Sequence, residues 1–501
     1  MTTTSESGVH AYRRVADMTE HDLVWEIADV AADPVAVPAE THSMVINRLI
    51  DNAAISAASV GRRLVVIARA QARAHRATPG ASVFGIDGSF SPEWAAFANG
   101  VAVHDLEFHD AFLAGHHAHP AGTIPALVAV AQQTGLRGTD LIRGIATSYE
   151  VQIRLAQGRP PQHATHDNGA YLGVALAAGL GTMLRLRPDT IRAAIGHAAY
   201  LTSLSRQAPE LCPSPWRFHT AAYIGRLAIE AVDRAMRGDG PPAPTRDARN
   251  SPDAGRLEAF WPADHVDLPD RGEPKRAIMD SYPRQHAACY FGQAPIDLAV
   301  RMHGHIGDVN DIESVVLHTS RHDRGLIGSG AGDPNTVNPD APRHVLSQSL
   351  TYLFAVALQD GAWHHERSYA SERAHRPDTL ELWRKITLTA PGGIVSQGPV
   401  GAEARFAIRA EITLRGGAPI VDELAAADAH PAGARPFGRN DYVAKFTELA
   451  EGVIDRREQQ RFLDVAMCLN DLKRGSLGML NPLVDNRILA EQSPITYGIF
   501  R

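Results

Sequence analysis

The segment DLEFHDAFLAGHHAHPAG, residues 105–122, combines four histidines and three acids within eighteen residues. Side chains of these types can bind a metal ion, carry out acid–base catalysis, or form a solvated polar face. A metal site requires a rigid spacing such as HExxH, and the segment contains none. Its three most closely spaced histidines, His116, His117 and His119, lie beside Pro120 in an expected loop. The spacing therefore disfavours a metal site.

His119 and Pro120 directly precede the apolar stretch IPALVAVAQ, which predicts a helix. His119 is thereby placed at a helix N-terminus, where free N–H groups and the positive end of the dipole favour an anion. A cationic His119 beside a bound carboxylate, with Asp110 nearby, would form an acid–base pair. A solvated polar turn is the alternative interpretation.

Four further clusters place polar side chains near the ends of expected helices. QHATHDNGAYLG contains His166, and SRQAPELCPSPWRFHTAA contains Arg206 and Arg217. Guanidinium groups can hold carboxylates in bidentate fashion, and surface arginines over a packed tryptophan are the alternative. SYPRQHAACYFGQAPIDLA contains His286. SQSLTYLFAVALQDGAWHH contains Tyr352 on an apolar helix, a position more typical of a core tyrosine with a satisfied hydroxyl.

The sequence lacks both a glycine-rich nucleotide loop and a metal signature. The clusters therefore suit a cofactor-free site for a small polyanion. A net charge of −7 without a Lys/Arg cluster argues against nucleic-acid binding. The three cysteines have no CxxC spacing, the N-terminus lacks an apolar signal region, and no window approaches eighteen consecutive apolar residues. We expect a soluble cytoplasmic protein that does not contact membranes.

At 501 residues, the chain predicts two domains. Residues 20–235 have helical periodicity, and the charge-poor stretch GAYLGVALAAGLGTMLRL predicts a central helix. In TGLRGTD, glycine is expected to close one helix and Thr/Asp to cap the next. GDGPPAPTRDARNSPDAG predicts a loop near residue 240.

Alternating apolar and polar residues in DIESVVLHTS and AEARFAIRAEITLRGG predict strands among helices. The tail from NDYVAKFTELAEG onwards returns to amphipathic helix. The predicted fold is mainly α with an α+β lid. It has a large all-helical domain (residues 1–274 and 436–501) and a smaller α+β lid domain (residues 275–435).

These residues also carry a resemblance that covers nearly the whole chain. LEFHDAFLAGHHAHPAGTIPALVAVAQ resembles the active-site segment of the MmgE/PrpD family. Within the family, VVLHTSRHDRGLIGSGAGDP and FAVALQDGAWHHERSYASERAHRPDTLELWRKI resemble 2-methylcitrate dehydratases of the actinobacterial type. The resemblance implies a helical domain completed by C-terminal helices, an α+β lid, a homodimer, and metal-free chemistry on small polycarboxylates.

By this resemblance, Asp110 and His119 match the family's first active-site segment, His286 its lid-side histidine, and Tyr352 its lid tyrosine. Four positions depart from the family's pattern. Ala111 stands where the family often has Thr, and Gly122 stands where it has an acid. Asn168 replaces a histidine, so that His166 is displaced by two residues, and Arg217 replaces a lysine. An arginine binds a carboxylate but does not give up a proton near neutral pH.

The expected reaction is dehydration of a tricarboxylate, 2-methylcitrate to 2-methyl-cis-aconitate, a step of propionate catabolism. His119 or His166 would act as base or acid with Asp110 orienting it. His286 and Tyr352 would lie across the site.

Carboxylates would be anchored by Arg206 and Arg217, with Asn168 in contact with the substrate, and lid closure would exclude water. Two alternatives follow from the four departures. One is a repurposed paralogue, acting as a decarboxylase, an isomerase or an alkylcitrate dehydratase. The other is a catalytically inactive homologue that only binds polycarboxylates.

Overall fold

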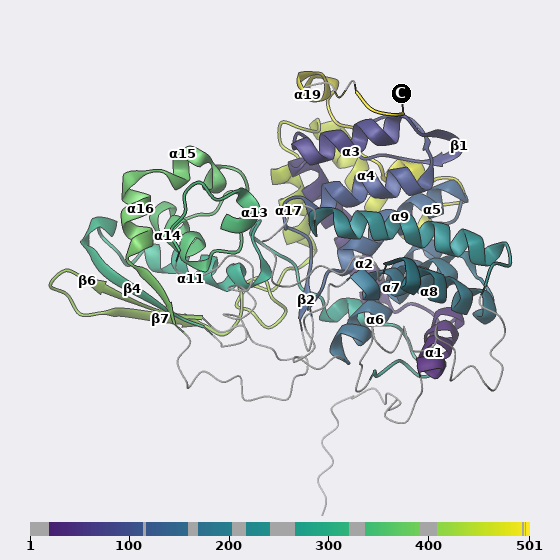
Figure 1. Cartoon of the computed structure of the whole chain (residues 1–501), viewed down its shortest axis with the longest axis horizontal. Coiled ribbons are helices and arrows are strands. Elements are labelled where there is room, and N and C mark those ends of the chain that lie inside the picture. The colour runs from purple at the N-terminus through teal and green to yellow at the C-terminus, as the bar shows by residue number, and fades with distance from the viewer. Residues whose placement is uncertain are drawn as a thin grey trace, which may run out of the picture.

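The structure is a computed structural model, and it describes residues 20–113, 117–158, 169–202, 217–240, 266–319, 336–389, 408–492, 495 and 497–500. Two parts stand side by side, a larger helical body and a smaller domain that combines helices with a sheet (Figure 1). The predicted fold class, mainly α with a smaller α+β part, is confirmed.

Nine helices described before residue 240 build the body. They are α1 (Glu20–Ala32), α2 (Ala39–Ala58), α3 (Arg63–Arg73), α4 (Pro92–His104), α5 (Ile124–Gln133), α6 (Gly138–Gln157), α7 (Gly169–Leu184), α8 (Pro188–Thr202) and α9 (Arg217–Met236). Helix α7 is the predicted charge-poor helix, and it packs against α1, α6, α8 and α9. A Cβ on Gly179 would lie 2.7 Å from the carbonyl oxygen of Gly144, so glycine lets α6 and α7 approach closely.

The junction of α5 and α6 confirms one predicted cap and corrects the other. Gly135 has a φ of +62°, and the next amide donates back to the carbonyl of Ala131 at 2.9 Å, which closes α5 as expected. The N-cap of α6 is Arg137 rather than the Thr/Asp pair. Asp140 acts instead from inside the first turn, where its carboxylate accepts from the Arg137 amide at 3.3 Å.

The body is not purely helical, because three short strands interrupt it. They are β1 (Arg76–Ala81), β2 (Phe112–Leu113) and β3 (His117–Ala118). Strands β2 and β3 pair antiparallel, with Leu113 opposite His117. This hairpin pairs two stretches inside the histidine-rich segment, and residue periodicity alone does not predict that pairing.

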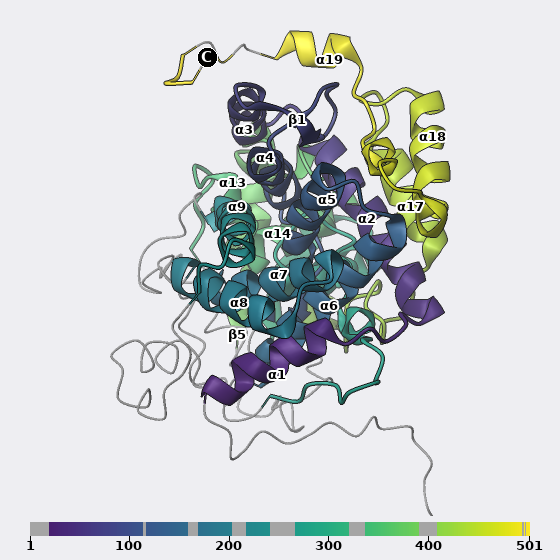
Figure 2. The same cartoon turned by 90° about the vertical axis from the view of Figure 1, so that its right-hand side faces the viewer.

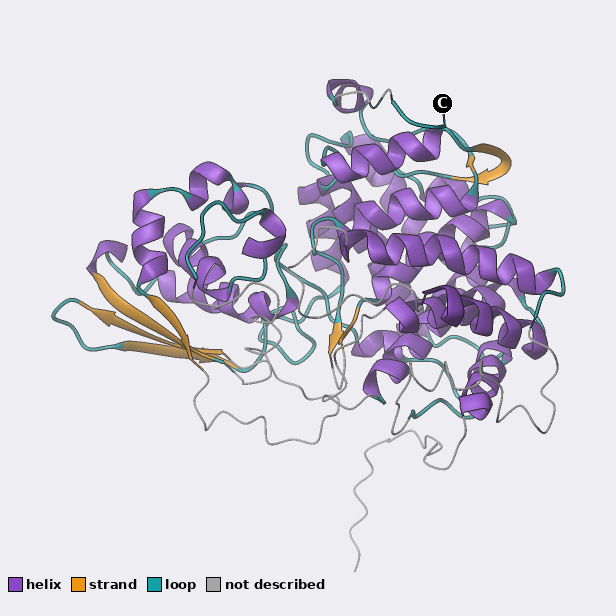
Figure 3. Cartoon of the chain, viewed as in Figure 1, coloured by secondary structure: helices purple, strands orange, loops and turns teal. Residues whose placement is uncertain are grey.

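The smaller domain is a four-stranded sheet with helices on one side (Figure 3). The sheet order is β5-β4-β6-β7, in which β4 and β5 are parallel and the other pairs antiparallel. Helix α14 carries only buried residues from Leu350 to Leu358 and lies at the centre of this domain. Its elements are α11 (Gln293–His303), β4 (Ile312–His318), α13 (Arg343–Leu346), α14 (Leu350–Asp360), α15 (Ser371–Ala374), α16 (Pro377–Arg384), β5 (Ile386–Thr389), β6 (Ile408–Leu414) and β7 (Ile420–Leu424).

The chain returns to the body after the smaller domain. Helices α17 (Arg439–Leu449) and α18 (Arg456–Met467) pack on α2, and α19 (Asn486–Glu491) follows (Figure 2). Short 3₁₀ turns connect elements, namely η1 (Pro120–Thr123), η5 (Ala277–Asp280), η6 (Tyr290–Gly292), η7 (Val309–Asp311), η8 (Arg367–Tyr369), η9 (Leu469–Asp471) and η10 (Leu477–Leu480).

Two clusters of buried apolar residues form the two cores. The body's cluster extends through Ala287 and Tyr290 and resumes at Tyr442, and the smaller domain's cluster runs from Ala288 to Ala427. The residue limits drawn from the sequence for the two domains stay a prediction, and most of the predicted loop near residue 240 lies outside the described residues. Within the described part of the chain, no helix is both long and apolar enough to cross a membrane.

Candidate active site

The histidine-rich loop is fixed at both ends and in its middle. It leaves α4 after His104, passes through β2 and β3, and enters α5 through η1. The amide of Ala111 donates to the carbonyl of Tyr282 at 3.0 Å, and the Tyr282 amide donates back at 2.9 Å. The loop is therefore tied to the segment that leads into the smaller domain.

A cavity of about 180 Å³ lies beside this loop. Residues from both parts of the molecule line it, and they are His104, Glu107, His109, Leu113, His117, His119, Phe218, Arg284, Cys289, Tyr290, Phe291 and Gln348. Its polar wall is made mainly of imidazoles, one guanidinium and one carboxylate.

The four histidines form a continuous row. The ring centroids of His104 and His109 are 4.1 Å apart, those of His109 and His119 are 4.9 Å apart, and those of His119 and His117 are 5.6 Å apart. The row brings together side chains up to fifteen residues apart in the sequence, because the end of α4 and the β2–β3 hairpin lie beside the same cavity.

Three of these imidazoles, those of His104, His109 and His119, are neutral, which corrects the expectation of a cationic His119. Burial, with nearby Arg284, lowers the pKa of His119 well below its usual value. Burial lowers the pKa of His104 to about 3, and burial together with His104 holds the pKa of His109 well below the ordinary range. A neutral imidazole has a lone pair that can accept a proton, and a bound carboxylate beside it would raise the lowered pKa and so strengthen it as a base.

Arg284 supplies the cavity's permanent positive charge among the described lining residues. Its Nη1 donates to the Glu107 carbonyl at 2.7 Å, and its Nη2 lies 3.5 Å from Nδ1 of His119. Because a guanidinium only donates, Nδ1 is the acceptor in this long contact, and it is the ring nitrogen that can take a proton when Arg284 turns to a bound carboxylate. Sequence reasoning missed Arg284, although it stands two residues before His286 in SYPRQH.

Glu107 joins the loop to the smaller domain. Its carboxylate accepts hydrogen bonds from the Ser347 hydroxyl at 2.5 Å and from the Gln348 amide at 3.0 Å. Glu107 has a φ of +51°, a left-handed conformation that costs energy for a residue with a side chain. Sequence reasoning gave Glu107 no role of its own, because its partners follow 240 residues later.

Asp110 lies beneath the cavity rather than in its lining. Its carboxylate is fully buried, 3.0 Å from Nε of Arg48, and accepts from the Tyr149 hydroxyl and the Ala121 amide, both at 2.9 Å. The His119 ring forms a hydrogen bond with the Asp110 backbone. Burial raises the pKa of Asp110, and Arg48 and Tyr149 oppose that shift. This is the environment of a positioning residue.

A second buried ion pair lies beneath the cavity, as the Arg48–Asp110 pair does. Nζ of Lys445, on α17, lies 2.7 Å from Asp51 of α2 and donates to the carbonyls of Phe108 and Arg284 at 3.1 and 3.0 Å. One C-terminal lysine therefore fixes the histidine loop and the arginine loop together.

Two residues expected across the cavity lie elsewhere. Nε2 of His286 is 2.8 Å from Oδ1 of Asp297 on α11, and His286 does not line the cavity. Tyr352 is fully buried in the smaller domain's core, and its hydroxyl donates to the Ser368 carbonyl at 2.6 Å. The placement of Tyr352 corrects the expectation of a site tyrosine, because a hydroxyl satisfied inside a core cannot reach a substrate.

The remaining predicted site residues cannot be placed. His166, Asn168 and Arg206 lie outside the described residues, and Arg217 is described only as the first residue of α9. Of the departures from the family pattern, Ala111 is buried in the backbone pairing with Tyr282.

Gly122 also has a structural reason. A Cβ at this position would lie 2.8 Å from Nε2 of His104, so any side chain larger than hydrogen would displace that histidine. Glycine at residue 122 therefore leaves room for the side chain of His104, whereas an acid at residue 122 would clash with it.

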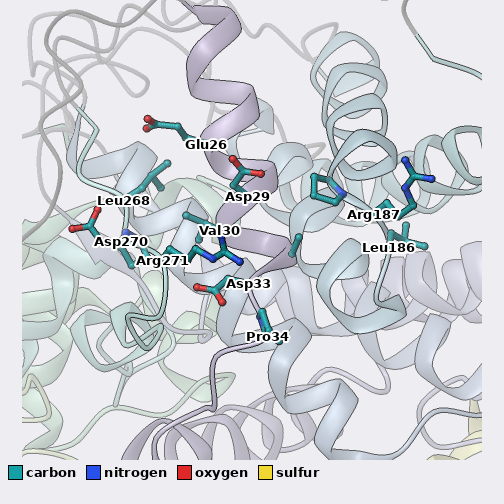
Figure 4. A pocket seen from close by; sticks show the side chains of 13 residues that line it. Glu26, Asp29, Val30, Asp33, Pro34, Leu186, Arg187, Leu268, Asp270 and Arg271 are labelled. Carbon is teal, nitrogen blue, oxygen red and sulfur yellow. The ribbon is translucent and has the colours of Figure 1, made fainter.

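A larger cavity of about 690 Å³ opens on the body between α1, the start of α8 and the segment around residue 270 (Figure 4). Its charged side chains are four acids and two arginines, namely Glu26, Asp29, Asp33, Asp270, Arg187 and Arg271. This excess of negative charge repels a polyanion, whereas the histidine-lined cavity does not. Among the described residues, no group of three His, Cys, Asp or Glu side chains is arranged to hold a metal ion.

Comparison with known proteins gives two family matches and a relative. Residues 22–250 match the MmgE/PrpD N-terminal domain, and residues 286–471 match the MmgE/PrpD C-terminal domain. The chain is 26% identical over 409 residues to cis-aconitate decarboxylase of Mus musculus, and the match covers 76% of each chain.

Proposed function

The chain belongs to the MmgE/PrpD family, and from that premise we propose that it is a lyase that acts on a small tricarboxylate by acid–base chemistry without a cofactor. The observation that carries the proposal is the row of neutral imidazoles beside Arg284 in one cavity. Its volume of about 180 Å³ suits a small organic acid, since sites for drug-sized ligands are about 300–1,000 Å³.

We propose dehydration of 2-methylcitrate as the reaction. His119 removes the proton from the carbon next to a carboxylate, and the electron pair of that bond forms the double bond. The hydroxyl leaves as water after it takes a proton from the imidazolium that has formed on His119. Arg284 holds the carboxylate on which enolate-like charge develops. His119 is partly exposed to the cavity, and its neutral form is the form that accepts a proton.

The surrounding residues keep this geometry and exclude water. The backbone of Asp110 holds the ring of His119, and the carboxylate of Asp110 holds the turn after His119 through the Ala121 amide. Glu107 ties the loop to Ser347 and Gln348, which closes the smaller domain over the cavity. Exclusion of water by a bound substrate would strengthen each electrostatic contact inside.

Decarboxylation of cis-aconitate is the second candidate, because the relative found in the comparison is named for that reaction. In that reaction Arg284 would hold a spectator carboxylate, the bond to CO₂ would break, and an imidazole would deliver a proton to the carbanion. By the same resemblance we propose a cytoplasmic homodimer, which light scattering of the purified protein would test through a mass near twice 54.0 kDa.

The test is an NMR screen of the purified protein against 2-methylcitrate, citrate and cis-aconitate. We expect 2-methylcitrate to be converted to its unsaturated product, and CO₂ release from cis-aconitate would select the second candidate. His119→Gln should lower turnover at least about 100-fold, the contribution usual for an acid–base group. Binding of all three acids without turnover would identify a binding homologue, and no binding would refute the proposed site.

A further inference from the structure

His109 is an anomaly in the row of imidazoles. It is 3% exposed, and neither of its ring nitrogens has a hydrogen-bond partner among the described residues. Nε2 of His104, which is 6% exposed, also lacks a partner. Both rings line the cavity.

Such groups carry an energetic cost. A buried polar atom without a partner costs about 1–3 kcal/mol, so a side chain with two such atoms weakens the empty protein. An apolar ring at residue 109 would avoid this cost. The cost is offset only if something in the cavity completes the hydrogen bonds.

The neighbours of His109 determine the protonation state of its ring when a ligand binds in the cavity. Its ring lies 4.1 Å from His104 and 4.9 Å from His119 between centroids, and Arg284 and Lys445 add positive charge nearby. Burial and these neighbours lower the pKa of His109, so the ring is neutral. A neutral imidazole presents one N–H donor and one acceptor nitrogen.

A hydroxyl group both donates and accepts, so one placed between His109 and Nε2 of His104 can accept from the N–H of one ring and donate to the acceptor nitrogen of the other. A carboxylate only accepts, so it would leave the acceptor nitrogen unsatisfied, and Arg284 is the better partner for it. We propose that His109, with His104 beside it, binds the hydroxyl of the substrate, so that the cavity selects hydroxylated tricarboxylates over their deoxy counterparts. The inference rests on the proposed function and narrows its substrate class.

The test compares two ligands that differ only in the hydroxyl, citrate and propane-1,2,3-tricarboxylate. Calorimetric titration in a His119→Gln background keeps the ligands unreacted. We expect citrate to bind at least about 10-fold more tightly, equivalent to about 1.4 kcal/mol. His109→Phe should bring the two affinities within about twofold, and His305→Phe, a change at an exposed histidine outside the cavity, should keep the difference.

Each outcome has one meaning. Equal affinities before substitution, or a preference for citrate that survives in His109→Phe, would overturn the hydroxyl subsite while leaving the proposed function intact. Failure of both acids to bind would refute the proposed function itself.

A second measurement separates ligand binding from a structural role. Because His109 has no hydrogen-bond partner to lose among the described residues, His109→Phe should unfold at a temperature no lower than the unsubstituted protein when no ligand is present. A clear fall in the unfolding temperature would assign His109 to the support of the fold and overturn the inference.

Discussion

At the scale of single residues, the polar side chains of the site form two layers, one that lines the cavity and one beneath it. The cavity is lined by neutral imidazoles and Arg284, and the pairs Arg48–Asp110 and Asp51–Lys445 lie beneath it. Buried ion pairs add little net stability over an apolar contact, but removal of one partner leaves an uncompensated charge. The two ion pairs beneath the cavity therefore fix the loops without lining the cavity themselves.

Asp110→Asn should lower the free energy of unfolding by about 3–5 kcal/mol, because Arg48 loses its buried counter-charge. Asp233→Asn, which breaks the exposed pair with Arg237, is the matched control and should cost under about 1 kcal/mol. Urea unfolding followed by circular dichroism measures both. Similar losses in the two variants would contradict a special role for the buried pair.

Arg284→Met should raise KM for the tricarboxylate at least about 10-fold, because a hydrogen bond from a charged donor contributes about 1.5–3 kcal/mol. Arg284→Lys should recover part of the loss by restoring the charge without the planar fork. Steady-state kinetics on the acid that the NMR screen identifies would show this. An unchanged KM in Arg284→Met would remove the residue from substrate binding.

At the scale of elements, glycine decides how closely helices approach. Gly138, the first residue of α6, faces the start of η9 so closely that a Cβ would lie 1.6 Å from the Leu469 carbonyl oxygen. Gly196, on α8, has no atom of the described residues within 4 Å of the corresponding position. The same residue type therefore has a packing role in one helix and none in the other.

Gly138→Ala should destabilise the protein by about 1–3 kcal/mol or more, because the backbone of α6 must move away from Leu469. Gly196→Ala should stabilise it by about 0.5–1 kcal/mol through the better helix propensity of alanine. Thermal unfolding of both variants tests the pair. Shifts of the same sign would contradict this assignment of the two glycines.

At the scale of the whole molecule, two cores meet at one cavity. The body contributes the histidine loop, the smaller domain contributes Ser347 and Gln348, and α17 returns to hold both through Lys445. The site is therefore complete only when the last helices have packed on α2.

Stability should rise with pH between about 3 and 6.5. The pKa of His104 is about 3 in the folded protein and about 6.5 when unfolded, and the pKa of His109 is lowered in the same direction, so the unfolded chain binds more protons in this window. Each histidine adds a slope of about 1.4 kcal/mol per pH unit, which vanishes above pH 6.5. Denaturant midpoints measured at several pH values should show that stability rises less steeply with pH in His109→Phe than in the unsubstituted protein. An identical dependence on pH would contradict the conclusion that His109 is buried and neutral.

Local patterns in the sequence determined the helical body, the charge-poor α7, the glycine that ends α5, and His119 as a residue before a helix. Periodicity and termination depend on residues a few positions apart, so they can be recognised without a fold. The sequence also indicated a site for a polyanion through histidine-rich and arginine-rich loops.

Only the tertiary structure decided which of those loops meet and in what charge state. Arg284 reaches His119 across 165 residues, and Tyr352 is buried in the other core. Both ring nitrogens of His109 lack a hydrogen-bond partner in the part of the chain that the structure describes. None of these facts is local, because burial and the distance between distant segments set both hydrogen bonding and pKa. The sequence supplied the chemical groups, and packing decided which of them are neutral, which are paired and which face the cavity.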